Sequence, residues 1–212
     1  MRLSMTGTIY TIGHSNHSLE RFLALLKQHG INVLCDIRSE PYSRMNPQFN
    51  REALKQGLWK NSITYVFLGK ELGARSEDPS CYVHGKVQYD CLAQTALFRK
   101  GIDALTERMQ SCRLAMMCAE KDPLDCHRTI LVSRHLVTLG IAIEHILPDG
   151  SLETHGQAVS RLLRQLNISE YDDLFRTRAA IIDDAYKTQG ERIAYTTRTQ
   201  SAETEQTRRS SR

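Results

Sequence analysis

Two cysteines carry the most reactive chemistry that this sequence offers, and each has charged neighbours. Cys118 ends an apolar run and is followed by Glu120. Cys126 comes directly before His127 and Arg128, where we expect a helix to begin. The free amides of a helix start, with an Arg or His nearby, can lower the pKa of a cysteine from about 8.5 to between about 3.5 and 7.5. We therefore expect a nucleophilic thiolate, with Cys126 better placed than Cys118.

Further polar side chains follow two other apolar runs of the chain. His14 and Ser15 come after the first run, and Asp36 and Arg38 come at the end of the next. We expect His14 and Glu120 to act as general acid or base. Asp36 and Arg38 lie two residues apart, so both can face one site and hold a substrate hydroxyl and an anion. A buried ion pair that orients the loop explains the same two residues equally well.

The segment from Arg38 to Arg75 is the basic part of the chain, with seven Lys or Arg against three Glu. This local excess suits a small phosphorylated or otherwise anionic substrate, including a nucleotide-like one, because arginine forks and backbone amides favour negative charge. The substrate-binding residues that we expect are Ser15, Asp36, Arg38, Ser43, Arg44, Tyr65, His127 and Arg128.

The net charge argues against a general nucleic-acid binder. The chain carries 28 Lys and Arg and 24 Asp and Glu, which gives +4. Four Arg and two Glu in residues 196–212 supply +2 of this charge, so residues 1–195 are close to neutral. Nucleic-acid binders usually show a concentrated basic face. A non-catalytic nucleic-acid or nucleotide-binding module stays the main alternative, because tyrosines that could stack on bases lie in or beside the basic segment, at Tyr42, Tyr65, Tyr82 and Tyr89.

A metal-binding protein is the second alternative. Cys118, Cys126, His127 and His14 could ligate zinc. Structural zinc sites usually carry ligands about two to four residues apart. Seven residues separate the two cysteines. The spacing therefore argues against this alternative, and we expect neither a metal nor another cofactor.

Apolar patterning predicts strands that alternate with helices, which indicates a parallel sheet covered on both faces. We expect a three-layer, Rossmann-like α/β fold with a mostly parallel five-stranded sheet and additional C-terminal helices. The expected strands are residues 8–12, 33–37, 64–68, 114–118 and 141–147. The expected helices are residues 19–30, 50–58, 91–109, 126–139, 158–166 and 171–186, and residues 69–90 are expected to form a long loop.

A single domain accounts for most of the chain. We expect a sheet core at residues 8–150, a helical extension at residues 151–195 and a disordered tail at residues 196–212. In such sheets, ligands bind at the carboxyl ends of the strands. The polar residues that follow the strands should therefore meet in one crevice. This placement predicts a thiol-based transferase or hydrolase.

The cysteine content and the hydropathy favour a cytoplasmic protein. None of the six cysteines forms a Cys-x-x-Cys pair, and the longest apolar runs are far shorter than a membrane span. No basic and apolar leader opens the chain. We expect reduced thiols and no membrane partner, and a homodimer is left open.

Five separated motifs occur in the order found in a known family. The chain resembles the domain of unknown function 488 family in Thr11-Ile12-Gly13-His14-Ser15; in Asp36-Ile37-Arg38 with Pro41 and Ser43; in Tyr65 with Leu68-Gly69 and Leu72-Gly73; in Cys118-Ala119-Glu120; and in Cys126-His127-Arg128. Residues 189–195 resemble the ending of longer members. The resemblance implies a bacterial or archaeal cytosolic α/β protein whose activity is not settled.

Overall fold

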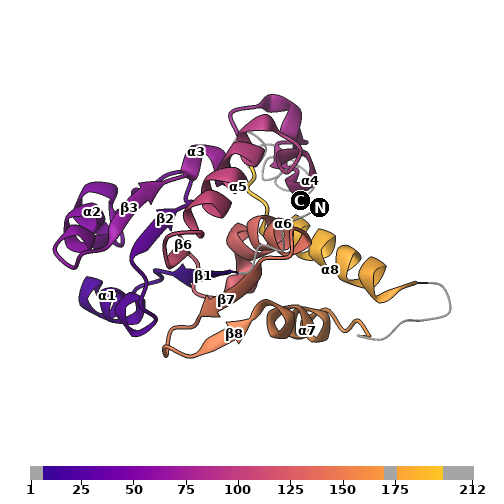
Figure 1. The fold of residues 1–212 in the computed structure, drawn as a ribbon. Helices are drawn as coiled ribbons and strands as arrows, with labels where there is room; N and C mark the ends of the chain where they lie inside the picture. Colours follow the sequence, from indigo (N-terminus) through magenta and orange to yellow (C-terminus); the bar gives the residue numbers. More distant parts are fainter. Residues whose placement is uncertain (1–6, 170–175, 198–212) are drawn as a thin grey trace, which may run out of the picture.

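A six-stranded sheet forms the centre of the molecule (Figure 1). The computed structural model describes residues 7–169 and 176–197. The strands lie in the order β3-β2-β6-β1-β7-β8; the first five are parallel, and β8 is antiparallel to β7. Their bounds are Thr8–Gly13 (β1), Val33–Asp36 (β2), Thr64–Phe67 (β3), Leu114–Cys118 (β6), Ala142–Ile146 (β7) and Leu152–Thr154 (β8). The predicted Rossmann-like α/β fold is confirmed.

The sheet has one strand more than the five that the sequence predicts. A turn follows β7, in which Gly150 has a φ of +96° and the Asp149 side chain accepts from the N–H of Ser151 at 2.9 Å. This turn reverses the chain, so β8 returns along the edge of β7. The three residues of β8 include one apolar side chain, at Leu152. So short a segment shows no recognisable alternation.

Helices cover both faces of the sheet and complete three layers. On one face, α1 (Leu19–Gln28) and α2 (Arg51–Trp59) pack against β-strand side chains that include Leu34 and Met117. On the other face, the core around Met116 includes α5 (Ala96–Arg108), α6 (Arg134–Thr138), α7 (His155–Gln165) and α8 (Arg178–Ile193). Successive residues of β6 point to opposite faces, and all are buried. The strand is therefore apolar throughout.

The helix predicted over residues 91–109 is in fact two helices. α4 (Tyr89–Leu92) ends before α5 begins at Ala96. Thr95 lies between them with extended backbone, and its Oγ1 accepts from the N–H of Phe98 at 3.1 Å. This is an N-cap, which starts a new helix. The apolar spacing continues across the break because both helices bury side chains in the same core.

Residues 69–90 do not form the long loop that the sequence predicts. They contain α3 (Gly69–Leu72), a 3-10 turn (Pro79–Cys81), a hairpin of β4 (Tyr82–Val83) and β5 (Lys86–Val87), and the start of α4. His84 and Gly85 connect the hairpin strands with φ values of +48° and +72°, as the central residues of tight hairpins do. Elements of two to four residues are too short to show a hydrophobic period.

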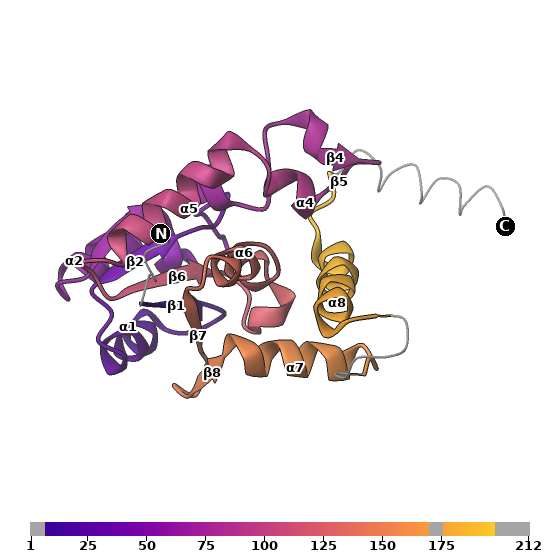
Figure 2. The same ribbon diagram turned by 45° about the vertical axis from the view of Figure 1, so that its right-hand side comes forward.

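The C-terminal segment returns to this hairpin. The helix predicted at residues 158–166 is observed as α7, and the helix predicted at residues 171–186 is observed as α8, which begins and ends later. Residues 171–175 of the second prediction lie outside the described residues. Figure 2 shows α8 running from beside α7 towards β4 and β5. There the N–H of Val87 donates to the Tyr195 carbonyl at 3.0 Å, and Thr196 bridges to Lys86. The sequence assigned Thr196 and Thr197 to the tail, but Thr196 pairs with Lys86 and the N–H of Thr197 donates to the Gly85 carbonyl at 2.8 Å. Residues 198–212 lie outside the described residues.

None of the helices within residues 7–169 and 176–197 has the length and apolar character needed to cross a membrane.

Candidate functional site

The turns after β1, β2 and β6 meet at the carboxyl edge of the sheet. β6 lies between the other two strands, and Gly13 pairs in register with Cys118. The N–H of His14 donates to the Cys118 carbonyl at 2.9 Å, and the N–H of Ile37 donates to the Met117 carbonyl at 3.1 Å. The predicted convergence of these three segments is confirmed.

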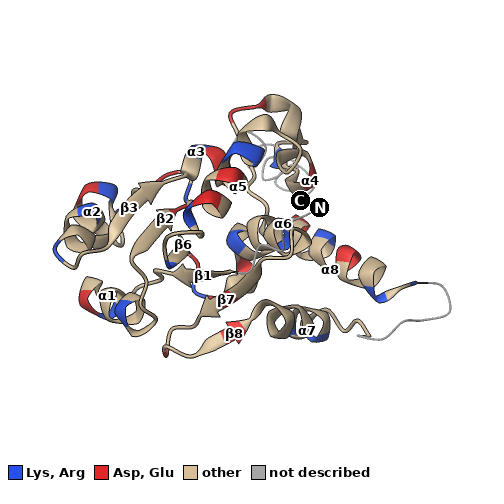
Figure 3. Ribbon diagram, viewed as in Figure 1, with Lys and Arg blue, Asp and Glu red and all other residues tan. Residues whose placement is uncertain are grey.

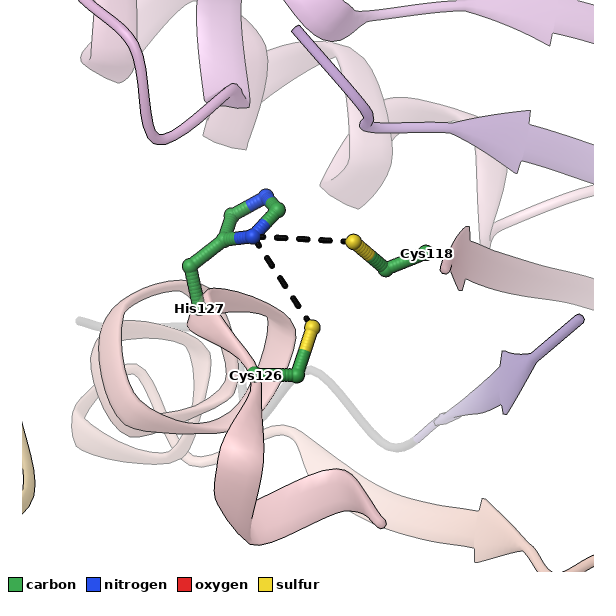
Figure 4. Close-up of side chains that lie close together, drawn as sticks. All are labelled: Cys118, Cys126 and His127. Carbon is green, nitrogen blue, oxygen red and sulfur yellow. Dashed lines mark hydrogen bonds between the residues drawn. The ribbon is translucent and has the colours of Figure 1, made fainter. Parts of the chain in front are cut away.

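Two cysteines and a histidine point toward one another at this edge (Figure 4). Nδ1 of His127 lies 3.6 Å from Sγ of Cys118 and 3.8 Å from Sγ of Cys126. All three atoms lie within 4.8 Å of one another, and all three residues are buried. On the other side of the ring, Nε2 lies 3.1 Å from the carbonyl oxygen of Ile37. A carbonyl can only accept, so Nε2 carries a proton and Nδ1 is the atom presented to the sulfurs.

The two thiols differ in their surroundings. Sγ of Cys126 accepts from the N–H of Arg128 at 3.4 Å and lies 2.9 Å from Oε2 of Glu120. Burial would raise the pKa of Cys126, but the hydrogen bond with Cys118 and the charges of Arg128 and His127 lower that pKa well below its ordinary value. Burial, with Cys126 and Glu120 beside it, raises the pKa of Cys118. Cys126 is therefore the thiol that ionises first.

Glu120 and His127, the two titratable neighbours of Cys126, both have raised pKa values. Burial and the negative charge of Cys126 raise the pKa of Glu120. Burial opposes charging of His127, but the neighbouring Cys126 raises its pKa above the ordinary value. A thiolate at Cys126 thus has two neighbours that hold protons more tightly than usual. Such a cluster can form a nucleophile and return a proton to a leaving group.

The helix expected at residues 126–139 begins differently from the prediction. The backbone of Cys126 is extended, and the chain then forms a π-helix at Arg128–Ser133 before α6 begins. Arg128 is 1% exposed, and its guanidinium donates to the carbonyl oxygens of Glu120 at 2.7 Å and Lys121 at 3.3 Å. These contacts fix the loop between the two cysteines. π-Helical turns are rare in proteins, and those that do occur often lie at functional sites.

A second buried network surrounds Asp36. Arg38 donates from Nε and Nη2 to the two carboxylate oxygens of Asp36, at 2.9 and 2.7 Å, and Tyr65 donates to Oδ2 at 2.8 Å. Nη1 of Arg38 lies 3.3 Å from Nε2 of His14, whose ring stacks on Phe49. Burial lowers the pKa of His14 to about 4. The buried ion pair between Asp36 and Arg38 is thus present, and substrate binding by the two residues stays a prediction.

A cavity of about 240 Å³ opens beside the cysteines. Of the predicted site residues, it is lined by Arg38, Cys118, Glu120, Cys126 and His127. The cavity is also lined by Tyr89, which the sequence offered only as a stacking residue of the nucleic-acid alternative. The lining residues that the sequence did not single out are Ser39, Glu40, Ala74, Arg75, Ala119, Asp125, Ile193 and Tyr195.

Two of the unassigned residues form the outer wall of the cavity. The Arg75 guanidinium lies 4.6 Å from the centre of the Tyr195 ring, and its Nη1 lies 2.8 Å from Oε1 of Glu40. Tyr195 reaches this position because its backbone pairs with the β4–β5 hairpin. The C-terminal segment therefore covers the site of its own chain.

The remaining predicted site residues, His14 among them, do not line the cavity. Asp36 and Tyr65 belong to the buried network, and Arg128 holds the loop. Ser15 has a φ of +47° and an Oγ that donates to Asn16 at 3.3 Å. Ser43 lies in a loop where its Oγ accepts from the N–H of Asn46 at 3.1 Å, and Arg44 is exposed. Substrate contacts by these residues stay a prediction.

Comparison with known proteins gives one match. A family model described as "Domain of unknown function DUF488" matches residues 18–135, which is more than half of the chain. Searches of curated proteins and of solved structures found no match.

Proposed function

The chain belongs to the DUF488 family, and because the description of that family assigns it no activity, we propose a function from the site itself. The protein is a thiol-dependent transferase or hydrolase that acts on a small anionic substrate, with Cys126 as the nucleophile. One observation carries this proposal. Sγ of Cys126 contacts a backbone N–H and the Glu120 carboxyl, faces an imidazole, and borders a cavity that two arginines also line.

The size and the lining of the cavity support a small substrate. Its volume of about 240 Å³ lies below the range of roughly 300 to 1,000 Å³ that is usual for drug-sized ligands. Arg75 is 44% exposed and paired with an exposed Glu40, so an incoming anion can replace that partner at little cost. Tyr89 and Tyr195 add aromatic surface for a ring of the substrate.

The chemistry takes two displacement steps. The Cys126 sulfur forms a bond to an electrophilic carbon or phosphorus atom, and the bond to the leaving group breaks with its electron pair. The leaving group takes the proton of the Glu120 carboxyl. Water, or another acceptor with an O–H or N–H, then attacks the same atom and gives a proton to Glu120, and the bonding pair returns to sulfur as the thiolate. Glu120 is better placed than His14, because both ring nitrogens of His14 have partners.

The charge distribution supports this proposal over the nucleic-acid alternative. Figure 3 shows Lys and Arg on the same elements as Asp and Glu, with both signs on α2, α5 and α8. A long polyanion prefers a concentrated basic face. Weak dependence of ligand binding on salt would agree with a small substrate, whereas a steep dependence would favour nucleic acid. The need for free thiols fits a cytoplasmic location.

A panel of small activated esters that carry a carboxylate or phosphate group tests the proposal. We expect the protein to turn over at least one ester and to show, by intact mass and peptide mapping, a covalent adduct on Cys126. Cys126→Ser should lose at least about 100-fold in rate, because serine is a far weaker nucleophile without a dedicated base. Cys112→Ser, which changes a half-buried thiol away from the cavity, is the matched control. Equal rates in Cys126→Ser and the wild-type protein would refute the proposal.

A further inference from the structure

We propose that Cys118, Cys126 and His127 form a binding site for Zn²⁺, which competes with the substrate for the same sulfurs. This inference deepens the proposed function, since it names an ion that would switch the thiolate off. It draws on the arrangement of donor atoms and on the hydrogen bonds that hold them.

The two sulfur–nitrogen distances match those around a tetrahedral zinc ion. With Zn–S near 2.3 Å and Zn–N near 2.0 to 2.1 Å, a tetrahedral angle places sulfur and nitrogen about 3.6 Å apart. Nδ1 of His127 lies 3.6 Å from Sγ of Cys118 and 3.8 Å from Sγ of Cys126. Figure 4 shows both sulfurs facing the same ring atom. Three donors can therefore bind one ion with little rearrangement.

Backbone groups already orient two of the three ligands. The Ile37 carbonyl accepts from Nε2 of His127 at 3.1 Å, which leaves Nδ1 as the donor atom for a metal. The N–H of Arg128 lies 3.4 Å from Sγ of Cys126. Metal-binding histidines almost always donate their other ring N–H to a carbonyl or carboxylate, and such partners orient the ligand. The supporting contacts of a metal site are thus present.

The donor set selects the class of metal. Two thiolates and one imidazole suit zinc and other soft divalent ions, whereas magnesium and calcium require oxygen ligands. Three protein ligands leave a fourth position open, and here the Glu120 carboxyl and the cavity lie beside it. A zinc ion would withdraw electron density from the Cys126 sulfur and occupy the space beside it, so we expect bound zinc to suppress attack by that sulfur.

The structure also explains why the sequence spacing gave the opposite expectation. Cys118 ends a strand and Cys126 follows a 3-10 turn at Pro123–Asp125, so seven intervening residues bring the two sulfurs together. His14, the fourth ligand considered from the sequence, turns its Nε2 to Arg38 instead.

Metal titration of the full-length protein tests the site. Protein freed of metal with a chelator is titrated with Zn²⁺ against a chromophoric chelator, and with Co²⁺ as a spectroscopic probe. We expect one ion per chain and a thiolate-to-cobalt charge-transfer band. Cys118→Ser, Cys126→Ser and His127→Gln should each weaken Zn²⁺ binding by roughly 100-fold or more, since loss of a supporting partner alone costs about 10- to 100-fold. Cys91→Ser and Cys112→Ser, with circular dichroism to confirm folding of every variant, should bind like the wild-type protein.

Absence of the charge-transfer band in the wild-type protein would overturn the inference, and this result does not depend on whether any variant folds. Zn²⁺ binding that none of the three ligand variants weakens would also overturn the inference. Alkylation separates this inference from the proposed function. If zinc-free Cys126 reacts rapidly but Zn²⁺ neither binds nor protects it, the metal site is wrong and the proposed function stands. If Zn²⁺ binds through the three residues but zinc-free Cys126 is inert, the inference holds and the thiol mechanism is wrong.

Discussion

A methyl group added at Gly13 would lie 1.9 Å from the carbonyl oxygen of Glu120. No side chain fits at that distance, so the turn after β1 and the loop after β6 approach each other only through a glycine. The same carbonyl oxygen accepts from Arg128. The missing side chain of Gly13 therefore leaves room for the backbone of Glu120, whose carboxyl contacts Cys126.

Substitution of Gly13 tests this close approach. Gly13→Ala should displace the Glu120 loop, lower the free energy of unfolding by about 1 to 3 kcal/mol and slow alkylation of Cys126. Urea unfolding and iodoacetamide labelling measure the two effects. Gly156→Ala is the control, because its Cβ would meet only the Thr154 hydroxyl at 4.0 Å, near the start of α7. Equal stability and labelling of the two variants would contradict the role of Gly13.

Removal of the Tyr195 side chain should open the cavity. Tyr195→Ala keeps the backbone pairing with Val87 but removes the ring that packs on Arg75. We expect a bulky aromatic disulfide reagent to modify Cys126 several-fold faster, and small anions to bind less tightly, because Arg75 loses a cation–π partner worth about 0.5 to 1 kcal/mol. Tyr42→Ala changes a tyrosine that is 64% exposed and outside the cavity lining, and serves as the control. Unchanged kinetics in Tyr195→Ala would show that the ring does not cover the site.

Buried His155 makes the fold sensitive to acid. Its Nδ1 lies 3.2 Å from Nε2 of His145, and its Nε2 lies 2.7 Å from the Tyr186 hydroxyl. Burial lowers the pKa of His155 to about 4, whereas an unfolded histidine has a pKa of about 6.5. The unfolded chain therefore binds more protons between these values, and stability is lost as the pH falls from about 6.5 to about 4.

The loss of unfolding free energy that protonation of His155 causes is large enough to measure. At pH 5 the difference in protonation should cost about 2 kcal/mol of unfolding free energy relative to neutral pH, at about 1.4 kcal/mol per pH unit. His155→Gln should reduce this loss, and His84→Asn, which changes an exposed residue in a turn, should leave it unchanged. Urea unfolding at the two pH values measures both. A pH dependence in His155→Gln as steep as in the wild-type protein would contradict the assignment.

The central part of the site could be predicted from the sequence because parallel strands bring their carboxyl ends to one edge. Cys118 and Glu120 follow a strand, and Cys126 and His127 precede a helix, so simple topology places all four together. The direction of each side chain could not be predicted. In the structure, Arg38 donates to Asp36 and Arg128 donates to a loop carbonyl, so anion binding by either arginine stays a prediction.

The outer wall of the cavity lay beyond sequence reasoning. Arg75 belongs to a segment without a hydrophobic period, and Tyr195 reaches the site by pairing with a hairpin whose strands have two residues each. The only sequence signal was the resemblance of residues 189–195 to the ending of longer family members. A contact between residues 120 positions apart depends on the complete fold, which local patterns do not encode.

Differential alkylation of the six cysteines tests the central claim most directly. The metal-free protein is treated with limiting iodoacetamide at neutral pH, and the modified peptides are quantified by mass spectrometry. We predict that Cys126 reacts first, at least roughly tenfold faster than half-buried Cys112, because the thiolate is the reacting form and an ordinary thiol is only a few per cent ionised at this pH. Labelling of Cys112 as fast as Cys126 would contradict the account.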